Sequence, residues 1–123
     1  MNKFRNMSIK LIFGYMLLIA AYSTSYAQSP CENTLCVVQY NASWNTANSV
    51  EWINELTDCE VKEIDIASSK TASSEYKIVV VPTIIIYNDG EEVKRFQANI
   101  MMTMEATKEE IQEALDEILM EDF

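Results

Sequence analysis

Residues 35–40 (Leu-Cys-Val-Val-Gln-Tyr) form a short and almost uninterrupted apolar run with β-branched side chains at its centre. Such a run is typical of a strand that is buried on both faces, as the central strand of a parallel sheet is. A strand of this kind needs helices on the faces of its sheet, so the run predicts an α/β domain.

A helical pattern follows the run. Ala47, Val50, Ile53 and Leu56 recur every three residues, which predicts a helix over this segment. Asn45 stands where an N-cap residue would accept a backbone N–H with its side-chain oxygen.

Residues 59–66 predict a second strand, in which charged side chains interrupt the apolar ones. A central strand does not tolerate so many charges, whereas an edge strand uses them to discourage stray pairing. Residues 68–77 are polar and predict a short helix.

The last third of the chain predicts a hairpin and a helix. An apolar strand over residues 83–87 is followed by the turn Asn88-Asp89-Gly90, and residues 91–97 return as its partner. Thr107 to Glu110 form a capping box in front of an amphipathic stripe. The stripe consists of Ile111, Ala114, Leu115, Ile118 and Leu119.

The resulting order, β-α-β-α-β-β-α, resembles the thioredoxin family over residues 35–120. Three local matches support the resemblance: a segment ending in Trp44, the Val81-Pro82-Thr83 loop, and the final hairpin turn. The resemblance implies a four-stranded mixed sheet flanked by helices and a cis-proline loop. Only a few residues, from Gln28, precede the first strand, so the family's N-terminal strand and helix are expected to be missing.

The main departure from the family lies just after Trp44. The family has Cys-x-x-Cys at this position, but here the four residues are Asn-Thr-Ala-Asn, and Gln39 replaces the family's buried acid. An amide cannot form a thiolate, so dithiol chemistry is excluded at this position. The resemblance implies a former active-site groove lined by Trp44, Asn45, Thr46, Ala47, Asn48, Val81, Pro82 and Thr83. Asn45 is then either a structural N-cap or a ligand for a partner, and Trp44 is either a docking platform or a half-buried aromatic residue.

The chain has three cysteines, Cys31, Cys36 and Cys59, and none stands at the family's reactive position. Three interpretations remain open: a structural disulfide, a relocated redox pair, and a bridge to a second molecule through the odd cysteine.

The first 27 residues have the pattern of a secretory signal peptide. Lys3, Arg5 and Lys10 precede an apolar run over residues 11–22, and Ser25-Tyr26-Ala27 resembles a cleavage site. An uncleaved anchor is the alternative, but the run is shorter than the roughly 20 residues that a membrane span needs. We therefore expect an exported chain, periplasmic or secreted, with no membrane contact after cleavage. It would have an N-terminal segment at 28–34 and a thioredoxin-like domain at 35–123.

The composition excludes several classes of site. The chain has no histidine and only two glycines, so it has no Ser-His-Asp triad and no glycine-rich phosphate loop. Its net charge of −10 argues against nucleic acid as a partner. A methionine cluster at residues 100–104 could hold Cu(I) or could be an apolar cover, and without histidine we expect no metal and no cofactor.

These observations predict an exported thioredoxin-like domain without the active-site dithiol, serving as a non-catalytic binding or accessory module. The alternative is a thiol–disulfide oxidoreductase that uses Cys31, Cys36 or Cys59. The expected partner is a protein or an extended peptide, bound at the former groove or along the edge strand 59–66. A disulfide-linked dimer is a further expectation from the odd cysteine.

Overall fold

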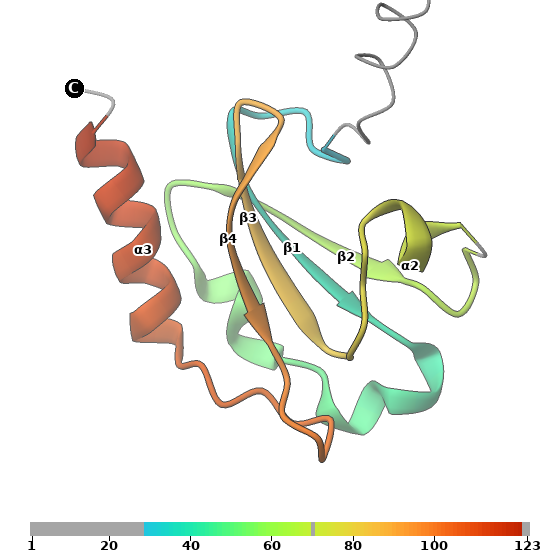
Figure 1. Ribbon diagram of the computed structural model, residues 1–123. Coiled ribbons are helices and arrows are strands. Elements are labelled where there is room, and N and C mark those ends of the chain that lie inside the picture. Colours follow the sequence, from blue (N-terminus) through green and yellow to red (C-terminus); the bar gives the residue numbers. More distant parts are fainter. Residues whose placement is uncertain (1–28, 70, 122–123) are drawn as a thin grey trace, which may run out of the picture.

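The computed structural model describes residues 29–69 and 71–121, which form one four-stranded sheet with helices on both faces (Figure 1). The strand order is β2-β1-β3-β4. β2 runs parallel to β1, while β3 is antiparallel to both β1 and β4. The predicted four-stranded mixed sheet is confirmed. The strands are β1 (Leu35–Asn41), β2 (Glu60–Asp65), β3 (Thr83–Asn88) and β4 (Glu91–Gln97).

The two faces of the sheet carry separate apolar clusters. On one face Val37 and Ile84 pack with Ile53 and with α3 (Lys108–Glu121). On the other face Val38 and Ile85 belong to a cluster that also takes in Tyr76, just after α2 (Ala72–Glu75). Figure 1 shows α3 and α2 on opposite sides of the sheet, as the full burial of β1 predicted.

The expected helix after β1 is replaced by two 3₁₀ helices, η1 (Ser43–Asn48) and η2 (Glu51–Glu55). The interpretation of Asn45 as an N-cap is wrong, because Asn45 is buried inside η1 with φ −114° and ψ 24°. The three-residue spacing of the apolar side chains explains the difference. A repeat of three matches the 3₁₀ helix, whose side chains at i and i+3 eclipse, better than the 3.6-residue α-helix.

The side chain of Gln39 on β1 binds the segment between η1 and η2 to the sheet. Its side-chain Oε1 accepts the Val50 N–H at 2.7 Å, and its Nε2 donates to the Val50 carbonyl oxygen at 3.2 Å. Nε2 also donates to Glu63 on β2 at 3.1 Å. Gln39 is almost fully buried, so no water replaces these bonds if the side chain is lost.

We expect Gln39→Leu to lower the free energy of unfolding by about 1–3 kcal/mol, because it leaves the buried Val50 N–H without a partner. Urea denaturation followed by circular dichroism measures the effect. Gln112 provides a matched control, since it makes the same two bonds with the Thr57 backbone at 2.9 and 3.2 Å on the surface. Gln112→Leu should cost less than about 1 kcal/mol, because water replaces its bonds. Equal losses in the two variants would contradict the role given to burial.

Two local signals in the last third of the chain are confirmed. The hairpin turn holds Asp89 and Gly90 at positive φ (54° and 84°), as a tight two-residue turn requires. At the start of α3, the Thr107 hydroxyl oxygen accepts the Glu110 N–H at 3.2 Å, which is the N-cap bond of the capping box.

The expected signal peptide lies outside the described residues. Within the two described ranges, no helix has the length and apolar character needed to cross a membrane.

Candidate active site

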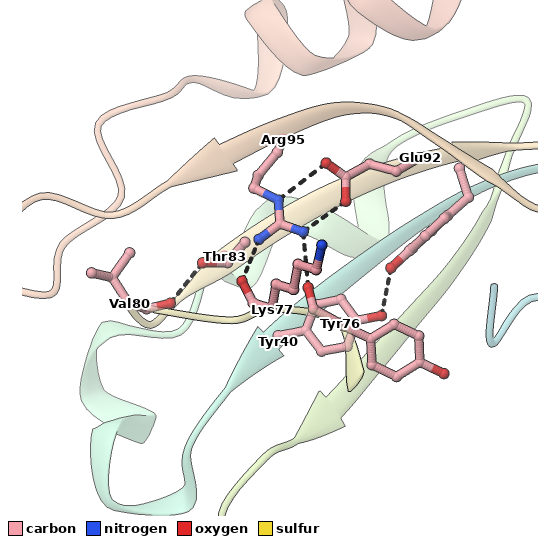
Figure 2. Close-up of polar contacts among 8 residues, drawn as sticks. Tyr40, Tyr76, Lys77, Val80, Thr83, Glu92 and Arg95 are labelled. Carbon is pink, nitrogen blue, oxygen red and sulfur yellow. Dashed lines mark hydrogen bonds and ion pairs between the residues drawn. The ribbon is translucent and has the colours of Figure 1, made fainter. Parts of the chain in front are cut away.

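The residues expected to line the former groove gather around η1 and the loop before β3. Asn45 Nδ2 lies 3.5 Å from the Val81 carbonyl oxygen, which joins the two segments. The Val81–Pro82 peptide bond is cis. Thr83 is buried, and its hydroxyl donates to the Val80 carbonyl oxygen at 2.6 Å (Figure 2).

The amide of Asn45 is used inside the protein. Its Nδ2 donates to Asn41 Oδ1 at 3.1 Å, and its Oδ1 accepts from Asn48 Nδ2 at 2.9 Å. Asn41 in turn donates to the Asn45 carbonyl oxygen at 3.2 Å and to the Ser49 hydroxyl at 2.8 Å. The two asparagines that stand where the family has cysteines therefore form part of a closed amide network.

The remaining groove residues are exposed. The Trp44 side chain is 67% exposed, and Thr46 and Ala47 are exposed beside it. The Thr46 hydroxyl donates to the Ser43 carbonyl oxygen at 2.6 Å. This end of the sheet therefore presents an aromatic surface but no nucleophilic sulfur.

Sulfur chemistry is possible at the opposite end of β1. Cys31 and Cys36 form a disulfide, with their Cα atoms 6.1 Å apart. Cys36 lies near the start of β1 and is fully buried, whereas Cys31 lies in the preceding segment and is partly exposed. Figure 1 shows that segment beside the β3–β4 hairpin, across the length of the sheet from η1.

Two side chains of β2 hold the loop that carries Cys31. Glu60, the register partner of Cys36, accepts the backbone N–H groups of Glu32 and Asn33 on Oε2, both at 3.0 Å. Lys62 Nζ donates to the Pro30 carbonyl oxygen at 2.6 Å, which places an ammonium group one residue before Cys31. One carboxylate and one cation thus flank the disulfide.

An open pocket of about 400 Å³ lies against Cys31. Its other lining residues are Ser29 and the turn of the hairpin, Asp89, Gly90 and Glu91. The Asp89 N–H bonds to the Thr34 carbonyl oxygen at 2.8 Å, which ties the turn to the cysteine loop. Of the two sulfurs of the disulfide, Cys31 is therefore the one that a molecule in solution can reach.

Behind the disulfide lies a cluster of tyrosines. Tyr87, the register partner of Cys36 on β3, shares a 2.8 Å hydrogen bond between hydroxyl groups with Tyr40. The ring of Tyr40 lies 5.2 Å from that of Tyr76. Burial raises the pKa of both Tyr40 and Tyr87 above the usual tyrosine value, so both hydroxyls stay neutral.

Arg95 on β4 lies beside this cluster of tyrosines (Figure 2). Its guanidinium donates to the carbonyl oxygens of Tyr76 and Lys77 at 2.9 and 2.7 Å and pairs with Glu92 at 2.7 Å. These bonds hold the segment after α2 against the tyrosines.

Cys59 is the free cysteine and lies on the other face of the sheet from the disulfide. Burial, together with the charge of Asp58, raises the pKa of its thiol to about 11. At neutral pH Cys59 is therefore a protonated thiol and a poor nucleophile.

The sequence predicted the three cysteines as candidates but missed the residues around them. The sequence predicts Glu60 and Lys62 only as charges of an edge strand. A parallel pairing of residues 35–41 with 60–65 would have indicated them, but the register of that pairing is not visible in the sequence.

Several solved thioredoxin structures resemble this fold. A mutant thioredoxin from Halobacterium salinarum is 21% identical over 75% of this chain and 87% of its own, with a TM-score of 0.57. The reduced Schistosoma mansoni thioredoxin pre-protein is 22% identical over 70% and 80%, with a TM-score of 0.54. Fasciola hepatica thioredoxin is 24% identical over 81% and 89%, with a TM-score of 0.50. No curated protein sequence matches the chain.

The family model named Thioredoxin matches residues 19–117, a range that includes both Cys31 and Cys36. The expectation of a non-catalytic binding or accessory module without a dithiol is therefore wrong. That expectation considered only the position now filled by Asn45 and Asn48, whereas the cysteine pair of this domain lies at the other end of β1. The chain belongs to the thioredoxin family.

Proposed function

We propose that this chain is a thiol–disulfide oxidoreductase whose reactive pair is Cys31 and Cys36. The observation that carries the proposal is the asymmetry of the disulfide. One sulfur borders an open pocket, and the other is buried at the start of β1. Thiol exchange needs this combination of a sulfur that a substrate can reach and a second sulfur that is protected.

The reaction starts with a substrate thiolate that enters the pocket and attacks the Cys31 sulfur. A mixed disulfide forms, the Cys31–Cys36 bond breaks, and its electron pair moves to the Cys36 sulfur. That sulfur takes a proton from water, because a thiolate between buried tyrosines and the Glu60 carboxylate is unfavourable.

A second thiolate of the substrate then attacks the substrate sulfur of the mixed disulfide. Cys31 leaves as a thiolate, the substrate becomes a disulfide, and the protein pair is reduced by two electrons. The ammonium of Lys62 donates to the carbonyl oxygen of Pro30, the residue before Cys31. The reverse sequence of steps reduces a substrate disulfide.

The proposed partner is a protein that presents its cysteine in an extended segment. In the described part of the chain β2 is an edge strand, and its first residue pairs with Cys36. A substrate segment added along the free edge of β2 would lie two strand spacings, about 10 Å, from β1. Strand pairing would hold the substrate there, while its cysteine reaches Cys31 through the pocket at the β3–β4 turn.

The reduction potential separates this function from a purely structural disulfide. Structural disulfides of secreted proteins have potentials below about −300 mV, whereas exposed exchange-active pairs range from about −270 to −120 mV. We expect the reduction potential of the Cys31–Cys36 pair to lie above about −270 mV, because the Cys31 side of the disulfide borders an open pocket.

Equilibration in dithiothreitol and glutathione redox buffers, followed by acid quench, alkylation and mass spectrometry, measures this potential. The Cys59→Ser variant serves as the control, since it removes the free thiol and leaves the pair intact. A potential below about −300 mV in both proteins would contradict the proposed function.

A further inference from the structure

The disulfide has a third potential ligand beside it. The Cys31 Sγ, the Cys36 Sγ and a carboxylate oxygen of Glu60 all lie within 4.8 Å of one another. The two backbone N–H groups of the cysteine loop bond to Glu60 Oε2. Within the described part of the chain, Glu60 Oε1 accepts no hydrogen bond, so it can act as a ligand without releasing the loop.

Reduction of the disulfide would concentrate negative charge at this place. The two thiols would lie beside the Glu60 carboxylate at the end of β1, with Asp89 and Glu91 lining the adjoining pocket, and loss of the thiol protons would add two more negative charges. Carboxylates this close to a thiolate repel it, and a bound divalent cation would remove the repulsion.

The ligand set and its spacing are suited to zinc. Cys31 and Cys36 are separated by four residues, within the range of cysteine pairs that bind this ion, and Zn²⁺ accepts both thiolate and carboxylate ligands. Bonds of about 2.3 Å to sulfur and about 2.0–2.2 Å to oxygen place ligand atoms roughly 3.3–3.8 Å apart in a tetrahedron. Small movements would bring the three groups to that spacing once the S–S bond is open.

We infer that the reduced chain binds one Zn²⁺ through Cys31, Cys36 and Glu60, with a water in the fourth position facing the pocket. Reduction supplies two electrons and two protons to the disulfide, and zinc then displaces the two thiol protons into solvent. Formation of the disulfide and binding of zinc exclude each other. The inference requires only that a chemical reductant opens the disulfide, so it does not depend on exchange with a protein substrate.

Zinc binding is tested on the purified chain in two states, oxidised and reduced with a phosphine. Competition with a chromophoric chelator gives the affinity for Zn²⁺, and Co²⁺ substitution shows thiolate-to-metal charge transfer. We expect one ion per reduced chain and none at this site in the oxidised chain. Cys31→Ser and Cys36→Ser should each lose the charge-transfer band or most of its intensity, whereas Cys59→Ser should retain it.

Glu60→Gln isolates the third ligand, because the glutamine oxygen still accepts the N–H groups of the cysteine loop. We expect it to weaken zinc binding at least about tenfold, since even outer-shell changes at metal sites commonly cost that much. The matched control is Glu32→Gln, which removes the same charge next to Cys31 but no ligand. Its affinity should stay within about threefold of the wild type, because an exposed charge contributes little.

Equal zinc affinity in the oxidised and reduced chains would overturn the inference, and so would equal affinity in Glu60→Gln and the wild type. Thiol titration of each sample separates this outcome from a failure of the proposed function. If the reductant yields two new thiols and zinc still does not bind, the metal site is wrong and the exchange reaction is untouched. If no new thiols appear, both proposals are contradicted.

Discussion

Replacing Cys31 with serine is expected to abolish thiol–disulfide exchange by this chain. Without Cys31 there is no disulfide for a substrate thiolate to attack, and the remaining sulfur of Cys36 is fully buried. The measurement is the turnover of insulin disulfides with dithiothreitol as reductant, compared with a buffer control. Turnover by Cys31→Ser should fall to the rate of the buffer.

Cys36→Ser should fail in a different way. Cys31 is still accessible and can form a mixed disulfide, but no second sulfur is present to resolve it. We therefore expect this variant to accumulate a covalent adduct with glutathione when it is treated with glutathione disulfide. Intact mass spectrometry detects that adduct, and Cys31→Ser should form less of it.

Cys59→Ser is the control for both experiments, because Cys59 lies on the other face of the sheet. Its turnover should equal that of the wild type. Full activity of Cys31→Ser, together with loss of activity in Cys59→Ser, would move the reactive sulfur to Cys59 and contradict the assignment.

The sheet could be predicted from the sequence because its signals are local. Each of three local signals fits one kind of structure. The apolar run at 35–40 fits a buried strand, the Asp89-Gly90 pair fits a hairpin turn, and the capping box at Thr107 fits the start of a helix. The helix after β1 was assigned incorrectly because residues 43–55 satisfy a spacing of three. The anchoring of Val50 by Gln39 also adds a tertiary constraint that no local pattern reveals.

The site was harder to predict because it depends on register. Alternation along a strand puts neighbouring residues on opposite faces, so Glu60 lies beside Cys36 while Cys59 faces the other cluster. A shift of one residue in the pairing of β1 with β2 would have placed Cys59 beside Cys36 instead. The sequence alone therefore left open which cysteines pair. The family resemblance placed the active-site position at Asn45 and Asn48, after the end of β1, whereas the cysteine pair lies at its start.

Cys59 is expected to resist alkylation in the folded chain, and its reaction should have a distinctive pH dependence. With a thiol pKa of about 11, its rate with iodoacetamide should rise about tenfold per pH unit from neutral pH until it approaches that value. An unfolded cysteine, with a pKa near 8.5, should reach its plateau about 2.5 pH units earlier. At pH 8 the thiolate fraction of folded Cys59 is about two hundredfold smaller, and its greater intrinsic nucleophilicity offsets only part of this, so we expect alkylation at least about tenfold slower.

Mass spectrometry of the oxidised chain follows this reaction at Cys59 alone, because Cys31 and Cys36 are joined. The urea-unfolded chain, measured at the same pH values, provides the reference rate.

The same protonation of Cys59 limits disulfide bridging between two chains, because a neutral thiol attacks disulfides slowly. Asp58→Asn should shift the profile slightly toward lower pH, since the Asp58 charge is the smaller of the two causes of the raised pKa. A plateau near pH 9 in the folded chain would show that Cys59 is an ordinary reactive thiol. Thiol–disulfide exchange could then no longer be assigned to Cys31 and Cys36 alone.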